Sequence, residues 1–154
     1  RRLAKEFGRE FIDLDREIER RNGVSVATIF EIEGEAGFRF RETQMLAEVS
    51  GADNLVVATG GGTVLSPLNR TRLLASTSVV YLHASASLLY SRTRNDRSRP
   101  LLQVPDPLEK IRQLVERRDP LYREVADVII EAGRDPGAAI DELEKVLPAL
   151  CKKH

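Results

Sequence analysis

Residues 55–62 read LVVATGGG, a short apolar run that ends in three consecutive glycines. The aliphatic and β-branched residues of this run favour a buried strand. Three glycines leave a bare backbone that a ligand can approach, and in parallel α/β sheets ligands bind beyond the carboxyl ends of the strands. No Gly-Lys-Ser/Thr follows, so the stretch is not a Walker A loop. A binding loop and a tight strand-to-helix turn are both compatible with it.

On either side of this run, short apolar stretches alternate with longer segments of helical period. The predicted strands cover residues 10–13, 55–59, 78–82 and 127–130. The predicted helices cover residues 15–21, 25–33, 34–50, 67–75, 85–93, 106–126 (with a break near Pro120) and 136–150. Three prolines fall where helices are predicted to begin, which suits their fixed φ and missing N–H: Pro67, Pro107 and Pro136. The alternation predicts an α/β fold with a mostly parallel sheet, in one domain over residues 1–154.

The composition is that of an ordinary globular protein and limits the partners. The chain has 154 residues, 42% hydrophobic and 31% charged, with 24 basic and 24 acidic side chains. No net field draws it to nucleic acid or to an anionic membrane, so any anion site must be local. A lone cysteine, Cys151, excludes an internal disulfide and favours a reducing compartment. We expect a cytoplasmic monomer without membrane or nucleic-acid partners.

Two aspartates follow the first predicted strand, in the stretch FIDLD of residues 11–15. Strand alternation places Asp13 and Asp15 on the same side. One carboxylate could then support a metal ion through water while the other accepts a hydroxyl proton. In the alternative, Asp15 caps the following helix and Asp13 only ends the strand.

Arginines supply the candidate anion sites. Glu35, Arg39 and Glu42 share one helical face, so Glu42 could hold the guanidinium of Arg39 while its other edge faces a carboxylate ligand. A solvated ladder of ion pairs would have the same spacing. Arg118 stands just before the predicted helix break. Residues 94–105 are irregular, basic and proline-containing, which is typical of a functional lid or of a solvated loop.

Taken in order along the chain, these motifs resemble shikimate kinase. The resemblance runs from Arg1 to about Leu150 and rests on residues 11–15 (FIDLD), 34–42 (GEAGFRFRE), 60–62 (GGG), 99–102 (RPLL) and 118–122 (RDPLY). It implies a P-loop, nucleoside-monophosphate-kinase-like three-layer αβα fold with a parallel sheet, a substrate-binding region at about 14–50 and a lid at about 94–105. It also implies transfer of the γ-phosphate of ATP to the 3-hydroxyl of shikimate, in aromatic amino-acid biosynthesis.

The resemblance assigns shikimate-binding roles to six positions. Asp15 is the catalytic residue, because the matching aspartate holds ring hydroxyls beside the attacking one. Arginines that match Arg39 and Arg118 grip the carboxylate. The backbone that matches Gly60, Gly61 and Gly62 lies against the ring. Each role agrees with the chemistry, since a small polyhydroxylated anion needs guanidinium groups and hydroxyl acceptors.

ATP and Mg²⁺ are the implied cofactors. Asp13 resembles the residue that supports Mg²⁺ through water, and Arg99 resembles the lid arginine that reaches the ATP phosphates. Arg92 and the loop of Arg134, Asp135 and Pro136 resemble the clamp on adenine.

The front of the chain departs from the family pattern. Members begin with a strand and a Gly-rich loop ending in Gly-Lys-Ser/Thr, which cradles the phosphates and supplies the direct Mg²⁺ ligand. Here the chain opens at Arg1 inside a helical pattern. We expect that central strand and loop upstream, roughly 15–20 residues, and expect residues 1–154 alone to be inactive. Two alternatives remain open: a related kinase of a small metabolite such as gluconate, and a non-catalytic binding module.

Overall fold

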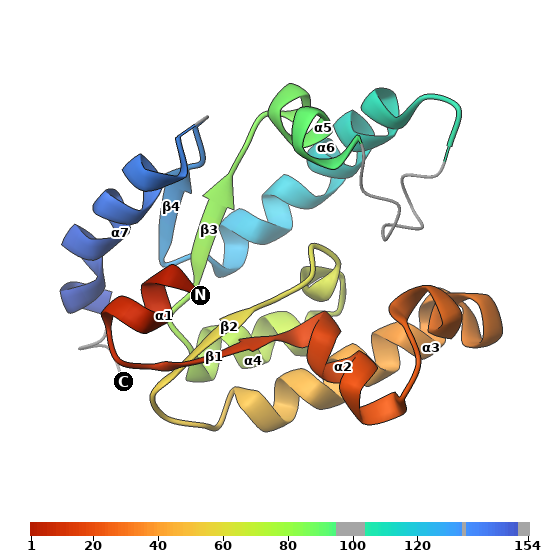
Figure 1. The fold of residues 1–154 in the computed structure, drawn as a ribbon, viewed down its shortest axis with the longest axis horizontal. Helices are drawn as coiled ribbons and strands as arrows, with labels where there is room; N and C mark the ends of the chain where they lie inside the picture. The colour runs from red at the N-terminus through yellow and green to blue at the C-terminus, as the bar shows by residue number, and fades with distance from the viewer. Residues whose placement is uncertain (95–103, 134, 151–154) are drawn as a thin grey trace. The chain divides into compact units, whose positions relative to one another are not determined.

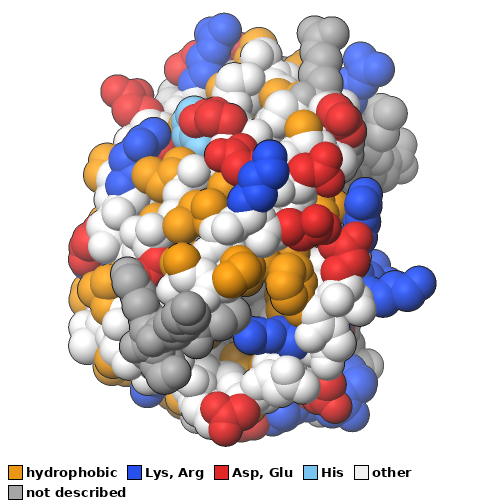
Figure 2. Space-filling model, turned by 90° about the vertical axis from the view of Figure 1, so that its left-hand side faces the viewer, with side chains coloured by type: hydrophobic (Ala, Val, Ile, Leu, Met, Phe, Trp, Pro, Cys, Tyr) orange, Lys and Arg blue, Asp and Glu red, His pale blue; other side chains and the backbone are white. Residues whose placement is uncertain are grey.

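The computed structural model describes residues 1–94, 104–133 and 135–150 (Figure 1). The chain divides into two compact units, Arg1–Ser76 and Thr77–His154. The described helices are all too short or too polar to cross a membrane. On the face drawn in Figure 2, acidic and basic side chains lie interspersed with hydrophobic ones.

In the first unit, two parallel strands are followed by helices. Its elements are α1 (Arg2–Glu6), β1 (Glu10–Asp13), α2 (Leu14–Asn22), α3 (Val26–Val49), β2 (Leu55–Ala58), the 3₁₀ turn η1 (Thr63–Leu65) and α4 (Pro67–Ser76). β1 pairs with β2 in parallel, in register from Glu10 opposite Leu55 to Asp13 opposite Ala58. The two strands therefore end side by side, and the residues that follow them emerge at the same edge.

The junction of β1 with α2 corrects one expectation. β1 ends at Asp13, whose side chain caps α2 by accepting a hydrogen bond from the backbone N–H of Arg16 at 3.2 Å. The strand ends where it was predicted to end, so the expectation that strand alternation places Asp13 and Asp15 on the same side is wrong, and the helix cap is Asp13 rather than Asp15. Asp15 lies in the first turn of α2, where its charge is favourable to the helix dipole.

Helix α3 is bent at Gly34, where the two predicted helices meet. Gly34 has φ 71° and ψ −178°, a backbone conformation that is almost restricted to glycine. Arg41 spans the bend, because its guanidinium donates to Glu33 at 2.6 and 3.1 Å and also to the Asn22 side chain of α2. The residues after Gly34 thus form a separate helical segment that carries Arg39.

The second unit repeats the pattern with a second parallel pair. Its described elements are β3 (Val80–His83), α5 (Ala86–Thr93), α6 (Pro107–Val125), β4 (Val128–Glu131) and α7 (Pro136–Leu150). The register runs from Val80 opposite Val128 to His83 opposite Glu131.

The predicted break near Pro120 is wrong, since α6 continues through it to Val125. Pro120 removes one backbone donor from the helix. The packing of α6 on α5 and burial of Val125 keep the helix continuous.

Candidate active site

The shared carboxyl edge of β1 and β2 brings two carboxylates to one glycine. A Cβ atom at Gly60 would lie 3.2 Å from Oδ1 of Asp15 and 3.2 Å from Oε1 of Glu42. Both acidic side chains therefore reach the backbone just after β2. A side chain at position 60 would crowd both carboxylates, so the close approach favours glycine at this position.

Glu42 is the buried centre of this cluster. Its side chain is fully enclosed, at 0% exposure. Oε2 accepts a hydrogen bond from Nη1 of Arg39 at 2.8 Å, and Oε1 accepts one from the hydroxyl of Thr63 at 2.7 Å. A carboxylate can be buried at tolerable cost only when charged or polar donors satisfy it in this way.

Arg39 lies over the glycine loop. A Cβ atom at Gly62 would overlap the guanidinium of Arg39, so any other residue there would displace this guanidinium from its position. The Nε and Nη2 atoms donate to Oε1 of Glu35 at 3.3 and 3.2 Å, and Cζ lies 5.1 Å from the centre of the Phe38 ring. The predicted contact between Arg39 and Glu42 is confirmed. Glu35 is about half exposed, so a ligand carboxylate could replace it on that edge.

Arg118 lies on α6 in the second unit. Its Nε atom is buried and has no hydrogen-bond partner among the described residues. A buried guanidinium donor without an acceptor is costly. This edge of Arg118 is therefore suited to receive an acceptor from a ligand.

Arg92 contacts the loop that joins β4 to α7. Its Nη2 atom donates to the carbonyl oxygen of Gly133 at 2.7 Å, and the side chain of Asp135 accepts from the N–H of Gly137 at 2.8 Å. Pro136 begins α7. The structure thus joins Arg92 to the predicted nucleotide loop, while Arg99, Arg134 and residues 95–103 of the predicted lid lie outside the described residues.

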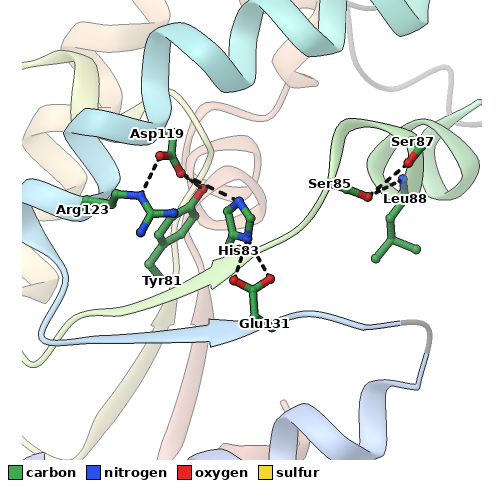
Figure 3. A network of polar contacts seen from close by, with 8 residues as sticks. All are labelled: Tyr81, His83, Ser85, Ser87, Leu88, Asp119, Arg123 and Glu131. Carbon is green, nitrogen blue, oxygen red and sulfur yellow. Dashed lines mark hydrogen bonds and ion pairs between the residues drawn. The ribbon is translucent and has the colours of Figure 1, made fainter.

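A polar network in the second unit was not predicted (Figure 3). The hydroxyl of Tyr81 on β3 donates to Oδ1 of Asp119 on α6 at 2.9 Å, and Arg123 donates to Oδ2 at 2.6 Å. His83 contacts Glu131 of β4 at 2.8 Å. Because Asp119 is next to Arg118, the network fixes this turn of α6 against β3.

This network shifts two pKa values. Burial raises the pKa of Tyr81, and the hydrogen bond to Asp119 raises it further. The hydrogen bond from Arg123 lowers the pKa of Asp119. The only sequence signal for this network is that Tyr81 and His83 share one face of a short strand. That spacing does not indicate which residues of other elements they contact.

Comparisons with known proteins show the family and the fold of this chain. The model of the shikimate kinase family matches residues 1–148. A shikimate kinase from Aromatoleum aromaticum is 54% identical over 99% of this chain and 88% of its own length. A solved shikimate kinase from Acinetobacter baumannii, in complex with shikimate, has a TM-score of 0.90 at 47% identity, covering 97% of this chain and 83% of that one. A solved shikimate kinase from Bacteroides thetaiotaomicron has a TM-score of 0.86 at 32% identity, and the match covers 95% of this chain and 88% of that one.

Parallel strand pairs with helical crossovers and these structural matches define the class as an α/β protein of the P-loop kinase type. With the family match over nearly its whole length, the chain belongs to the shikimate kinase family.

Proposed function

We propose that this chain, in the intact protein, transfers the γ-phosphate of ATP to the 3-hydroxyl of shikimate. One observation carries the proposal beyond family membership. The guanidinium of Arg39 is oriented by the buried carboxylate of Glu42 and lies against Gly62, while the carboxylates of Glu42 and Asp15 both reach Gly60. This arrangement offers a carboxylate-binding group and a hydroxyl acceptor within one small cluster.

Asp15 is proposed as the catalytic residue. Its carboxylate lies at the carboxyl edge of β1 and β2, next to Gly60. A carboxylate there can hold the ring hydroxyls and accept the proton of the attacking one. Little covalent chemistry is otherwise required of the protein, because phosphoryl transfer depends mainly on positioning and charge stabilisation.

The carboxylate of shikimate is assigned to Arg39 and Arg118. Arg39 can exchange the exposed Glu35 for a ligand carboxylate, and the buried Nε of Arg118 gains an acceptor on binding. Arginine is the suitable residue because its planar fork binds a carboxylate through two parallel hydrogen bonds.

ATP is proposed to bind with its adenine between Arg92 and the β4–α7 loop that carries Arg134 and Pro136. Arg99 is proposed to contact its phosphates. Asp13 fits the water-mediated support of Mg²⁺. Mg²⁺ usually retains several waters and uses one or two carboxylates together with substrate phosphates, and the capping carboxylate of Asp13 has a second oxygen for a metal-bound water. When bound, Mg²⁺ neutralises charge that develops on the transferring phosphate.

The single cysteine supports a reducing compartment such as the cytoplasm.

Replacing each proposed carboxylate-binding arginine by lysine tests the substrate site. In the intact protein, Arg39→Lys and Arg118→Lys should each raise the KM for shikimate about 10- to 100-fold, because lysine keeps the charge but loses the bidentate fork. The KM for ATP should change by less than about twofold. Arg112→Lys, an exposed substitution on the same helix as Arg118, is the matched control. An unchanged KM for shikimate in both variants would contradict the assignment.

A further inference from the structure

Behind Glu42 lies a chain of buried hydrogen bonds that the proposed reaction does not use directly. Thr63 and Asn69 are each 1% exposed. The hydroxyl of Thr63 donates to Oε1 of Glu42 at 2.7 Å, and the side-chain amide of Asn69 donates to the backbone carbonyl of Thr63 at 3.0 Å. Glu42, Thr63 and Asn69 are thus three buried polar side chains that are linked by hydrogen bonds. Such a buried network holds its members in defined positions.

The same chain fixes the glycine loop. The backbone N–H of Thr63 donates to the carbonyl of Gly60 at 3.2 Å, and that of Leu65 donates to the carbonyl of Gly62 at 3.0 Å. Asn69 belongs to α4, so its amide attaches this turn to the helix that follows. Thr63 is therefore joined through its backbone to the loop after β2 and through its side chain to Glu42.

We infer that Thr63, supported by Asn69, is a positioning residue for shikimate binding, which it governs through Glu42 and Arg39. The inference rests on the proposed function. The terminal torsion of a glutamate is broad, so one hydrogen bond does not fix its carboxylate. With Thr63 on Oε1 and Arg39 on Oε2, both oxygens are held and the plane is set. The guanidinium of Arg39 is then held in a single orientation before the substrate arrives.

Removal of the Thr63 hydroxyl should act through Arg39. Oε1 of Glu42 would be left buried without its donor, and the carboxylate would be free to rotate away from Arg39. These contacts all lie within the first unit, whereas the described nucleotide contact proposed above, that of Arg92 with Gly133, belongs to the second unit. Shikimate binding should therefore weaken, while ATP binding stays as it is.

The chain offers matched variants for the test. Thr63→Val keeps the shape and removes the hydroxyl, whereas Thr63→Ser keeps the hydroxyl. Thr71→Val is the control, because Thr71 lies on α4, is exposed, and donates to the carbonyl of Pro67 at 3.1 Å, away from the site. Asn69→Ala removes the support of Thr63 from the other side, so the test does not depend on one variant folding.

Steady-state kinetics on the intact protein provide the readout. We expect Thr63→Val to raise the KM for shikimate about tenfold or more with a smaller change in kcat and an unchanged KM for ATP. Asn69→Ala should do the same more weakly, and Thr63→Ser and Thr71→Val should match the wild type. In a double-mutant cycle, Thr63→Val should add little to Glu42→Gln, because both act on the same carboxylate.

Two results would overturn the inference. One is a shikimate KM that does not change in folded Thr63→Val or Asn69→Ala, with folding checked by thermal unfolding. The other is full additivity with Glu42→Gln. Failure of the proposed function is a separate outcome, because the wild type would then form no shikimate phosphate in the same assay.

Discussion

At the scale of single residues, Asp13 and Asp15 differ although only Leu14 separates them. Asp13 ends β1 and caps α2, whereas Asp15 lies within the helix beside Gly60. Their positions suit the different roles that are proposed for them. The first can act on a metal ion only from a capping position, and the second faces the backbone that is proposed to hold the substrate ring.

Conversion of each aspartate to asparagine separates these roles. Asp15→Asn should lower kcat by about two to four orders of magnitude, the range for loss of a general base. Asp13→Asn keeps the helix cap, since asparagine caps as well as aspartate. It should therefore fold normally and raise the Mg²⁺ concentration needed for half-maximal rate. Titration of Mg²⁺ against rate measures both effects, and normal activity in both variants would show that these carboxylates are only structural.

The sequence predicted part of this site. The contact of Arg39 with Glu42 follows from their spacing on one helical face, and it is present. The hydroxyl of Thr63 could not be predicted in the same way, because it reaches Glu42 from 21 residues further along the chain. Only the packing of η1 against α3 creates that contact. Periodicity describes neighbours within one element and carries no information about partners on another.

At the scale of elements, the predicted strands and helices agree with the structure to within about two residues at each end. The prolines correctly predicted where helices begin, and the apolar runs correctly predicted the strands. Pro120 is the exception, since local chemistry favours a break there and the tertiary contacts of α6 override it.

The bend at Gly34 gives a prediction for helix α3. Gly34→Ala should lower the free energy of unfolding by about 1–3 kcal/mol, because its backbone conformation is strained for any residue with a Cβ atom. No heavy atom lies within 4 Å of that Cβ, so crowding adds nothing. Gly51→Ala is the control, with open space and no positive φ. Urea unfolding measures the free energy of unfolding of both variants. Equal values for Gly34→Ala and Gly51→Ala would contradict the predicted backbone strain at position 34.

At the scale of the whole molecule, charge is balanced and the electrostatic features are local. Basic and acidic side chains number 24 each, and the groups with clear pKa shifts belong to small networks. In the second unit, the network around Asp119 joins β3 to α6. Its contribution to stability should therefore depend on pH.

The sign follows from the lowered pKa of Asp119. A carboxylate whose pKa is lower in the folded state stabilises the fold above its ordinary value of 3.8, and loses that effect as pH falls through the lower folded pKa. Asp119→Asn should therefore melt roughly 2–4 °C below the wild type at pH 7. The difference should shrink as pH falls below 3.8. Asp53→Asn, at an exposed bend, is the control. A difference that is the same at pH 7 and at pH 3 would refute the linkage.

Phosphoryl transfer by the intact protein tests the central claim most directly. The protein is incubated with ATP, Mg²⁺ and either shikimate or gluconate, and the products are measured by ³¹P NMR. The account predicts shikimate 3-phosphate with one equivalent of ADP, no product from gluconate, and loss of product in Asp15→Asn. Phosphorylation of gluconate in place of shikimate, or ADP release without a shikimate phosphate ester, would contradict it.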